Sequence, residues 1–367
     1  MDLTDEDNLR LNVLLATRPQ AVRIDEATLT VWGLTERGDA RISLNPNDRP
    51  ERYVRRVREF LSGRVLGFPG GYPVFIRRWT RMGQQREEGL ANLLLLGEPE
   101  AVVAVSGAAG LSDELARRAW WAFEDAGNAR RMLAHSAVAN GRMGTRLANF
   151  LLEHLPFETD PAAMTETVQR ILQPGLIDEG KRQALWRRAQ SQPALLLGFL
   201  VAIPDSLPEP LPPRLDIDWA ALDALNHPAA CLLRRLYGAS GQTFLAACRR
   251  ILDKPQDLES LTRLFSLLVA FCQPLRPEGA AETDWKTLEQ EAADFAHSCP
   301  SPDSAWETWS ADVTTARVLS GLSYAVLRPH LGDASATAGL LRRKLRPVLD
   351  PLSLRVGNLL RVESGLR

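Results

Sequence analysis

Arginine and aromatic residues are concentrated between positions 41 and 86 of the 367-residue chain. This segment holds eleven arginines against three acidic residues, which gives it a local charge of +8. Guanidinium groups contact phosphates, and aromatic rings stack on unpaired bases. The segment is therefore a candidate surface for nucleic acid or another macromolecule. The binding residues that we predict within it are Arg52, Arg55, Arg56, Tyr72, Arg77, Arg78, Trp79 and Arg81.

A purely structural interpretation of these arginines stays open. The whole chain has 44 basic and 45 acidic residues, so acidic partners for the arginines are plentiful. Arg52, Arg55 and Arg56 share one face of a predicted helix, which is also the pattern of a solvated helix surface. Because the excess of positive charge is only local, the cluster indicates either a binding face or a face whose arginines pair within the chain.

Motifs of catalysis are scarce in this chain. The sequence contains no GxGxxG, GxSxG or HExxH motif. His227 and Cys231 are four residues apart on a predicted helix, and a Cys–His pair can form a nucleophile. More often such a cysteine is a small core residue and such a histidine caps a helix. We therefore predict no catalytic residue, no metal site and no cofactor, and no small-molecule substrate is evident.

The elements that must position the arginine cluster form a small α/β unit over residues 1–80. Thr4 has the position of a helix N-cap, and Pro50 can start a second helix. Period-two alternation on both sides of a polar turn at Thr35–Asp39 predicts a β-hairpin. The expected elements are helices at 4–16 and 50–63, hairpin strands at 22–31 and 40–44, and a further strand at 72–76.

Beyond Thr80 the chain reads as successive helices of about 12 to 16 residues with short Gly, Pro or Asn breaks. Residues 110–121 match residues 175–186 at 7 of 12 positions. In both copies we expect the aspartate at the fourth position, Asp113 or Asp178, to cap a helix, and the final tryptophan to be buried. Chance similarity of two amphipathic helices is the alternative. A true repeat of this length favours an α-solenoid-like stack, which presents an outer surface to a macromolecule.

The fold class that we predict is mainly α, with a helical-repeat body and a small N-terminal α/β unit containing the hairpin. Proline is dense in PDSLPEPLPP, which is typical of an extended linker. The predicted divisions are 1–80 for the α/β unit, 81–203 for the helical repeat, 204–216 for the linker and 217–367 for a C-terminal helical region.

Composition excludes several classes of protein. Hydrophobic residues make up 45% of the chain and charged residues 24%, which is the balance of a globular protein. The four cysteines are too few for a disulfide scaffold, so a reducing compartment is expected. The first residues are acidic where a secretory signal would be basic, and no apolar stretch reaches about 20 residues. We expect a soluble cytoplasmic protein without a membrane span.

Several stretches resemble one family, the sulfur reduction protein DsrS of sulfur-oxidising bacteria. They are MDLTDEDNLRLNVLLA at the start, VLGFPGGYPVFIRRWTRMGQ at 65–84, LLLLGEPEAVVAV at 93–105, ARRAWWAF at 116–123 and ILQPGLIDE at 171–179. The resemblance implies a soluble cytoplasmic protein linked to the oxidation of stored sulfur through the reverse-acting sulfite reductase pathway. It also implies an accessory or regulatory role, and it supplies no catalytic residue.

Three functional hypotheses follow. The first is a non-enzymatic accessory or regulatory protein of dissimilatory sulfur oxidation that binds RNA or a pathway protein. The second is a thiol-dependent sulfur-transfer or redox protein that uses Cys231. The third is a scaffold for subunits of the pathway enzymes. The sequence does not indicate an oligomeric state.

Overall fold

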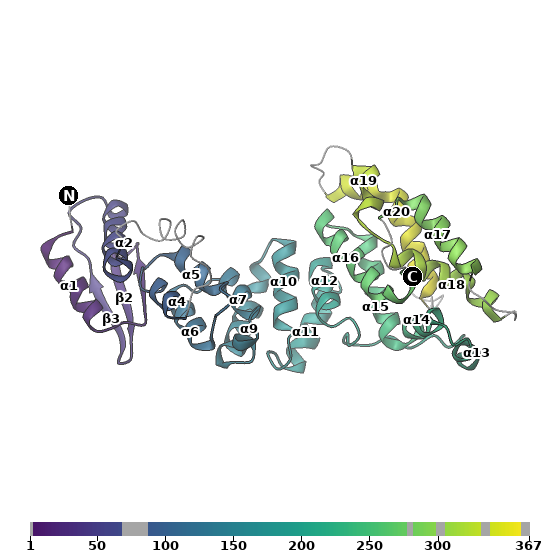
Figure 1. Cartoon of the computed structure of the whole chain (residues 1–367), viewed down its shortest axis with the longest axis horizontal. Coiled ribbons are helices and arrows are strands. Elements are labelled where there is room, and N and C mark those ends of the chain that lie inside the picture. The colour runs from purple at the N-terminus through teal and green to yellow at the C-terminus, as the bar shows by residue number, and fades with distance from the viewer. Residues whose placement is uncertain (1–2, 68–86, 277–281, 299–304, 332–337, 361–367) are drawn as a thin grey trace. The chain divides into compact units, whose positions relative to one another are not determined.

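The computed structural model describes residues 3–67, 87–276, 282–298, 305–331 and 338–360. These residues confirm a mainly α protein with a small antiparallel sheet near the N-terminus (Figure 1). Contacts within the chain divide it into two compact units. The first unit comprises residues 1–156 and 173–176, and the second comprises residues 157–172 and 177–367. No helix among the described residues is long and apolar enough to cross a membrane.

The first unit opens with the predicted helix α1 (Asp5–Ala16), where the Thr4 hydroxyl accepts a hydrogen bond from the Asp7 N–H at 3.3 Å. Helix α2 (Pro50–Leu66) starts at its proline and ends at Gly67, whose φ of +73° suits glycine. Between the two helices lie the three strands, which pair in the order β1-β2-β3. Their bounds are Ala21–Asp25 for β1, Thr30–Thr35 for β2 and Gly38–Ser43 for β3.

One detail of the predicted hairpin is wrong. The run at 22–31 is not one strand but two, because a turn separates β1 from β2. The Asp25 carboxylate accepts hydrogen bonds from the N–H groups of Ala27 and Thr28 at 3.0 and 3.2 Å, and Leu29 adopts a φ of +48°. The hairpin between β2 and β3 forms as predicted, with Thr35 opposite Gly38. The strand predicted at 72–76 lies outside the described residues.

Helices α1 and α2 cover one face of the sheet and form a common core with it. The buried residues of this core are Leu11, Leu14, Val22, Val31, Leu44, Tyr53, Val57 and Leu61. The carboxylate of Asp7 is also fully buried, and it accepts hydrogen bonds from the Tyr53 hydroxyl at 2.5 Å and the Asn45 N–H at 2.8 Å. These bonds tie both helices to the segment that follows β3, because a buried carboxylate is stable only when it is hydrogen-bonded.

Beyond α2, the described residues of the first unit form helices. They are α4 (Glu87–Leu93), α5 (Pro99–Ser106), α6 (Asp113–Ala122), α7 (Ala126–Leu133), α8 (Ser136–Ala139) and α9 (Arg142–His154). They bear out the helical body that the sequence predicts after the sheet, but the predicted length of about 12 to 16 residues is wrong for all except α9, since the other five have 4 to 10 residues.

The predicted repeat is only partly reproduced. Asp178 caps its helix as expected and accepts from the Lys181 N–H at 2.8 Å, but Ser112 rather than Asp113 caps α6. Asp113 instead accepts hydrogen bonds from the N–H groups of Arg142 and Met143, both at 3.0 Å. It thereby caps α9, whose own N-cap residue is a glycine without a side chain.

The tryptophans of the repeat also differ. Trp186 is buried at 4% exposure, whereas Trp121 is only half-buried, and its neighbour Trp120 occupies the core at 2% exposure. The final tryptophan is therefore a core residue in one copy only, and Trp121 is left at the surface.

Removing the Asp113 carboxylate should destabilise the first unit. We expect Asp113→Ala to lower the free energy of unfolding by about 1 kcal/mol, because two N–H groups at the start of α9 lose their acceptor. Urea unfolding followed by circular dichroism measures this loss. Asp113→Asn retains one acceptor oxygen and should lose less, and equal stability of the alanine variant and the wild type would contradict the capping role.

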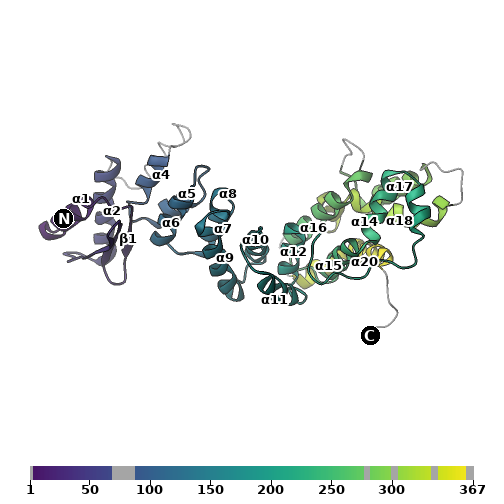
Figure 2. The same ribbon diagram turned by 90° about the horizontal axis from the view of Figure 1, so that it is seen from below.

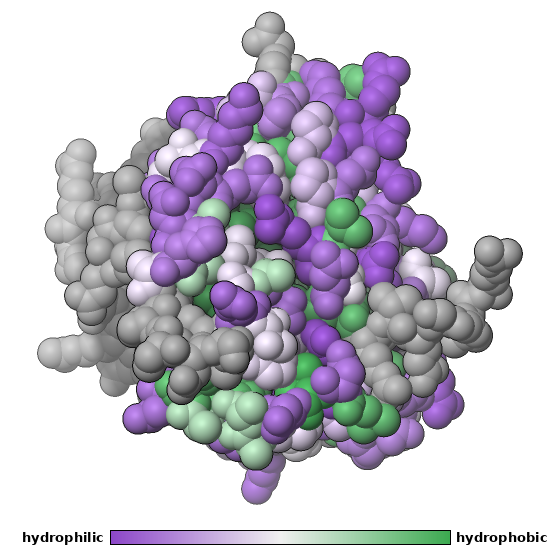
Figure 3. Space-filling view, turned by 90° about the vertical axis from the view of Figure 1, so that its right-hand side faces the viewer, coloured by the Kyte–Doolittle hydropathy of each residue, from purple (hydrophilic) through white to green (hydrophobic). Residues whose placement is uncertain are grey.

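The described residues of the second unit form helices and no strand. They are α10 (Pro161–Ile171), α11 (Glu179–Ala189), α12 (Pro193–Ala202), α13 (Trp219–Ala224), α14 (Pro228–Tyr237), α15 (Ala239–Asp253), α16 (Leu258–Phe271), α17 (Trp285–Ser298), α18 (Ala305–Ser320), α19 (Tyr324–Leu331) and α20 (Ala338–Leu359). Helix α12 packs against α10, α15 and α16 (Figure 2). The visible face of this unit is mostly hydrophilic, which is typical of a surface in contact with water (Figure 3).

The proline-rich segment at 204–216 lies within the second unit, and its backbone is fixed to the helices there. The Leu211 N–H donates to the Thr243 hydroxyl at 2.8 Å, and the Arg214 N–H donates to the Tyr237 carbonyl at 2.9 Å. Arg235 also contacts both carboxylate oxygens of Asp205, at 2.7 and 2.8 Å. The segment is not extended throughout, because it turns at 204–205, bends at 208–209 and 215–216, and has a φ of +53° at Glu209. It is anchored to the helices by these contacts.

Candidate macromolecule-binding surface

A row of three side chains crosses the sheet on the face that points away from α1 and α2. Arg23 on β1 lies opposite Trp32 on β2, which lies opposite Arg41 on β3. Side chains alternate between the two faces of a strand, and the neighbours of these three residues, such as Val22 and Val31, belong to the core. The row therefore lies on the outer face of the sheet.

Trp121, from the last turn of α6, extends this row. The guanidinium carbon of Arg23 lies 4.8 Å from the ring centroid of Trp121 and 5.5 Å from that of Trp32. Arg41 lies 5.8 Å from the Trp32 centroid, and the Trp121 indole N–H donates to the Asp39 carboxylate at 3.2 Å. These four residues, Arg23, Trp32, Arg41 and Trp121, are named here the Arg–Trp platform.

The platform has the chemistry of a stacking surface. Cation–π attraction holds each guanidinium over a ring and fixes the orientation of both planar groups. The two tryptophans and Arg23 are half-buried, and Arg41 is exposed. No salt bridge joins Arg23 or Arg41 to another residue that the structure describes. The platform thus offers aromatic rings and two guanidinium groups that form no salt bridge with a described residue, and such groups suit unpaired bases and phosphates.

The predicted arginines of α2 lie on the other side of the sheet from the platform. Arg55 is 81% exposed and donates to the Glu59 carboxylate at 3.1 Å, while Arg56 is mostly buried and pairs with the carboxylate of Asp48. Arg52 is exposed at the surface of the same helix. For Arg55 and Arg56, these pairs match the structural interpretation, since their charges are balanced within the chain.

The other predicted binding residues lie outside the described residues. They are Tyr72, Arg77, Arg78, Trp79 and Arg81. Sequence reasoning missed Arg23, Trp32 and Trp121. A signal for the first two was present, because the alternation that placed Val22 and Val31 in the core also places Arg23 and Trp32 on the outer face. No local signal points to Trp121, which is 89 residues farther along the chain than Trp32.

The cysteines support a catalytic site less strongly than the Arg–Trp platform supports a binding surface. Cys231 is exposed on α14, and the ring of His227 accepts a hydrogen bond from the Ala229 N–H at 3.1 Å, so His227 is a helix cap. Cys248 and Cys272 are buried, and burial raises the pKa of both thiols, that of Cys272 to about 12. Cys299 lies outside the described residues. No group of three or more His, Cys, Asp or Glu residues in the described ranges could hold a metal ion.

Comparison with protein-family models, curated proteins and solved structures finds no match to this chain.

Proposed function

We propose that the protein is a non-enzymatic accessory or regulatory protein that binds single-stranded RNA on its Arg–Trp platform. The observation that carries this proposal is the row of Arg23, Trp32 and Arg41 across the outer face of the sheet, extended by Trp121. An unpaired base can stack on an accessible indole or guanidinium plane, and the arginines can contact the adjoining phosphates. We further propose that this binding serves dissimilatory sulfur oxidation, and the support for that part is the resemblance of several stretches to the DsrS family.

Substitutions in the platform should weaken RNA binding in a way that separates stacking from charge. We expect Trp32→Ala to weaken binding of a fluorescein-labelled 12-nucleotide single-stranded RNA about tenfold, because one stacked base contributes about 1 to 3 kcal/mol. We expect Arg41→Ala to make the plot of log affinity against log salt concentration less steep, by the amount that corresponds to the loss of about one phosphate contact. Fluorescence anisotropy at several salt concentrations measures both effects.

Arg55→Ala is the control, because Arg55 is also an exposed arginine but lies on α2, on the other side of the sheet, where it pairs with Glu59. Its affinity should equal that of the wild type. If Arg55→Ala weakens binding and Trp32→Ala does not, the site is on α2 instead. Absence of binding, or binding that does not depend on salt, would rule out the RNA proposal.

A further inference from the structure

The two edge strands of the sheet differ in whether their outward-facing backbone groups form hydrogen bonds. At the β1 edge, the Val22 N–H donates to the Leu94 carbonyl at 2.8 Å, so a neighbouring segment covers this edge. At the β3 edge, the N–H and C=O groups of Asp39 and Arg41 form no hydrogen bond with another described residue. Open strand edges of this kind are templates for pairing with another strand.

The register of the hairpin shows which residues of β3 direct their backbone groups outward. The Leu44 N–H donates to the Leu29 carbonyl across the hairpin at 2.9 Å, so the even-numbered residues from Gly38 to Leu44 pair with β2. Hydrogen-bonded positions alternate along an antiparallel strand. Asp39, Arg41 and Ser43 therefore present their backbone groups to the open edge, and the Ser43 carbonyl already accepts from Arg10 at 3.1 Å.

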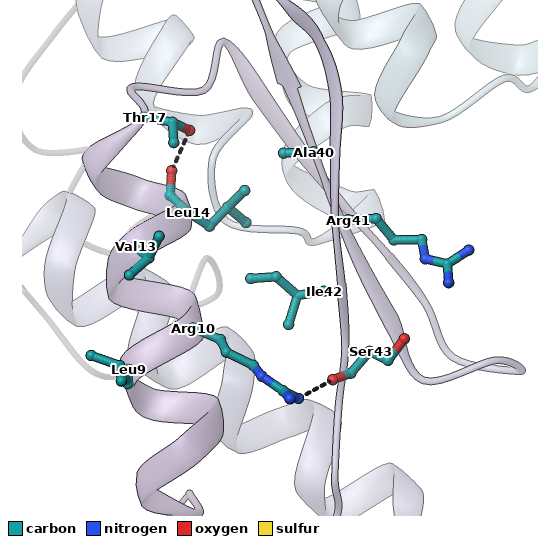
Figure 4. A pocket seen from close by; sticks show the side chains of 9 residues that line it. All are labelled: Leu9, Arg10, Val13, Leu14, Thr17, Ala40, Arg41, Ile42 and Ser43. Carbon is teal, nitrogen blue, oxygen red and sulfur yellow. Dashed lines mark hydrogen bonds between the residues drawn. The ribbon is translucent and has the colours of Figure 1, made fainter.

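An open apolar cavity of about 570 Å³ lies beside this edge, between α1 and β3. Leu14 and Ile42 point into it from the two sides, whereas the side chain of Arg41 points away (Figure 4). On α1, Leu9 is 67% exposed and Val13 is 57% exposed, and both line the cavity. An exposed aliphatic pair beside an open strand is typical of an interaction surface.

The charges on β3 favour a second copy of this chain as the occupant. Asp39 and Arg41 are two residues apart, both are exposed, and both side chains lie on the outer face of the sheet. If two β3 strands pair antiparallel about a two-fold axis at Ala40, Asp39 of each copy lies opposite Arg41 of the other. Directly opposed side chains of opposite charge stabilise a strand pair, whereas a two-fold axis at Arg41 would oppose two cations.

We propose that two copies of this protein associate by pairing their β3 strands antiparallel about Ala40, which joins the two sheets into one. Leu9 and Val13 of α1 lie on the core side of the sheet next to the axis, so the same contact covers them in both copies. The interface is isologous, as a two-fold axis requires. This inference goes beyond RNA binding. Arg23, Trp32 and Trp121 stay outside the paired edge, whereas Arg41 belongs both to the platform and to the edge, so Trp32 is the residue that reports on RNA binding alone.

Charge reversal tests both the association and its register. Sedimentation equilibrium of the full chain at 1–100 μM should give a mass twice the 40.7 kDa of one chain. Arg41→Asp opposes two aspartates at each contact, and Asp39→Arg opposes two arginines. We expect each single variant to weaken self-association at least about tenfold, because both symmetric contacts change from attraction to repulsion.

Recombining the charges should restore the complex. An equimolar mixture of the Arg41→Asp and Asp39→Arg chains again opposes unlike charges at each contact and should form mixed dimers, as should the double variant with itself. Val13→Asp should weaken association in every background, whereas Arg52→Asp on α2 should not change it. Circular dichroism of each variant establishes that the variant is folded. This control is needed above all for Asp39→Arg, because that substitution removes the hydrogen bond from the Trp121 indole N–H.

Two results would overturn the proposal. A wild-type chain that stays monomeric up to 100 μM would exclude a second copy and leave an extended peptide of another protein as the occupant. A dimer that the single reversals do not weaken, or that mixing does not restore, would exclude this register of β3. Neither result bears on RNA binding by Trp32, so the two proposals can fail separately.

Discussion

Raising the pH from 9 to 12 should cost the second unit about 4 kcal/mol of stability through the thiol of Cys272 alone. Burial raises the pKa of this thiol from an ordinary value of 9.0 to about 12. Each pH unit between the two values corresponds to about 1.4 kcal/mol. In this window the unfolded chain releases the proton and the folded chain keeps it, so stability is full below pH 9 and falls as the pH rises toward 12.

Two other buried groups also lower the stability of the second unit as the pH rises. Burial raises the pKa of Cys248 well above its usual range, and the thiol of Cys272 raises it further. The pKa of Tyr237 is raised by burial and by the carboxylate of Asp312, which accepts the tyrosine hydroxyl proton in a hydrogen bond. Tyr237 adds its effect only above pH 10, where the unfolded tyrosine begins to ionise.

The dependence on pH can be assigned to one thiol with two alanine variants. Cys272→Ala lowers stability at every pH because it leaves a small cavity, but its free energy of unfolding should fall less steeply between pH 9 and 12. Cys231→Ala is the control, because Cys231 is exposed and its removal should leave the slope unchanged. Urea unfolding at each pH, under reducing conditions, measures the slopes. Identical slopes in the Cys272→Ala variant and the wild type would contradict the assignment.

The same shifts bear on the hypothesis of a thiol-dependent enzyme. The thiolate is the nucleophile, and Cys248 and Cys272 keep their protons at neutral pH. Cys231 is the exposed free thiol among the cysteines that the structure describes. Because His227 is engaged as a helix cap, its ring is held at the start of α14 by the Ala229 N–H. A sulfur-transfer step at Cys231 thus has less structural support than binding at the platform.

Local signals in the sequence were sufficient to predict several elements. Thr4 caps α1 and Pro50 starts α2 because both effects depend on a few neighbouring residues. The turn at Asp25–Leu29 was missed because Leu29 breaks the strand by its left-handed conformation, which leucine rarely adopts. Alternation of apolar residues continues through such a turn, so periodicity alone does not reveal it.

The candidate site was less predictable than the fold, for a physical reason. Charge clustering in the sequence pointed to residues 41–86, and the three predicted binding residues that the structure describes there lie on α2. Among them, Arg55 pairs with Glu59 and Arg56 pairs with Asp48. The platform depends on strand register and on Trp121, which tertiary packing brings to Arg23 from 98 positions away. Cross-strand neighbours follow from register, and register becomes known only once the turn between β1 and β2 is placed.

A single methyl group at Gly198 should destabilise the second unit by about 2 kcal/mol. A Cβ atom at this position of α12 would lie 2.5 Å from the Cβ of Val168 and 2.9 Å from the carbonyl oxygen of Thr165, both on α10. Overpacking of this kind costs about 1 to 3 kcal/mol. The Thr165 hydroxyl also donates to the Ala194 carbonyl across the two helices at 3.0 Å, and separating them would strain a bond that contributes about 1 kcal/mol.

Helix propensity opposes this loss, since replacing glycine by alanine within a helix gains about 1 kcal/mol. Gly339 in α20 is the matched control, because no atom of another described residue, apart from its chain neighbours and its own helix backbone, lies within 4 Å of the position of its Cβ. We expect Gly198→Ala to lower the free energy of urea unfolding and Gly339→Ala to leave it unchanged or raise it slightly. Because both substitutions add the same methyl group to a helix, changes of opposite sign in the free energy of unfolding would separate the effect of helix packing from the effect of helix propensity. A Gly198→Ala variant as stable as the wild type would mean that α10 and α12 can move apart without cost, and the close packing of these helices would then not stabilise the unit.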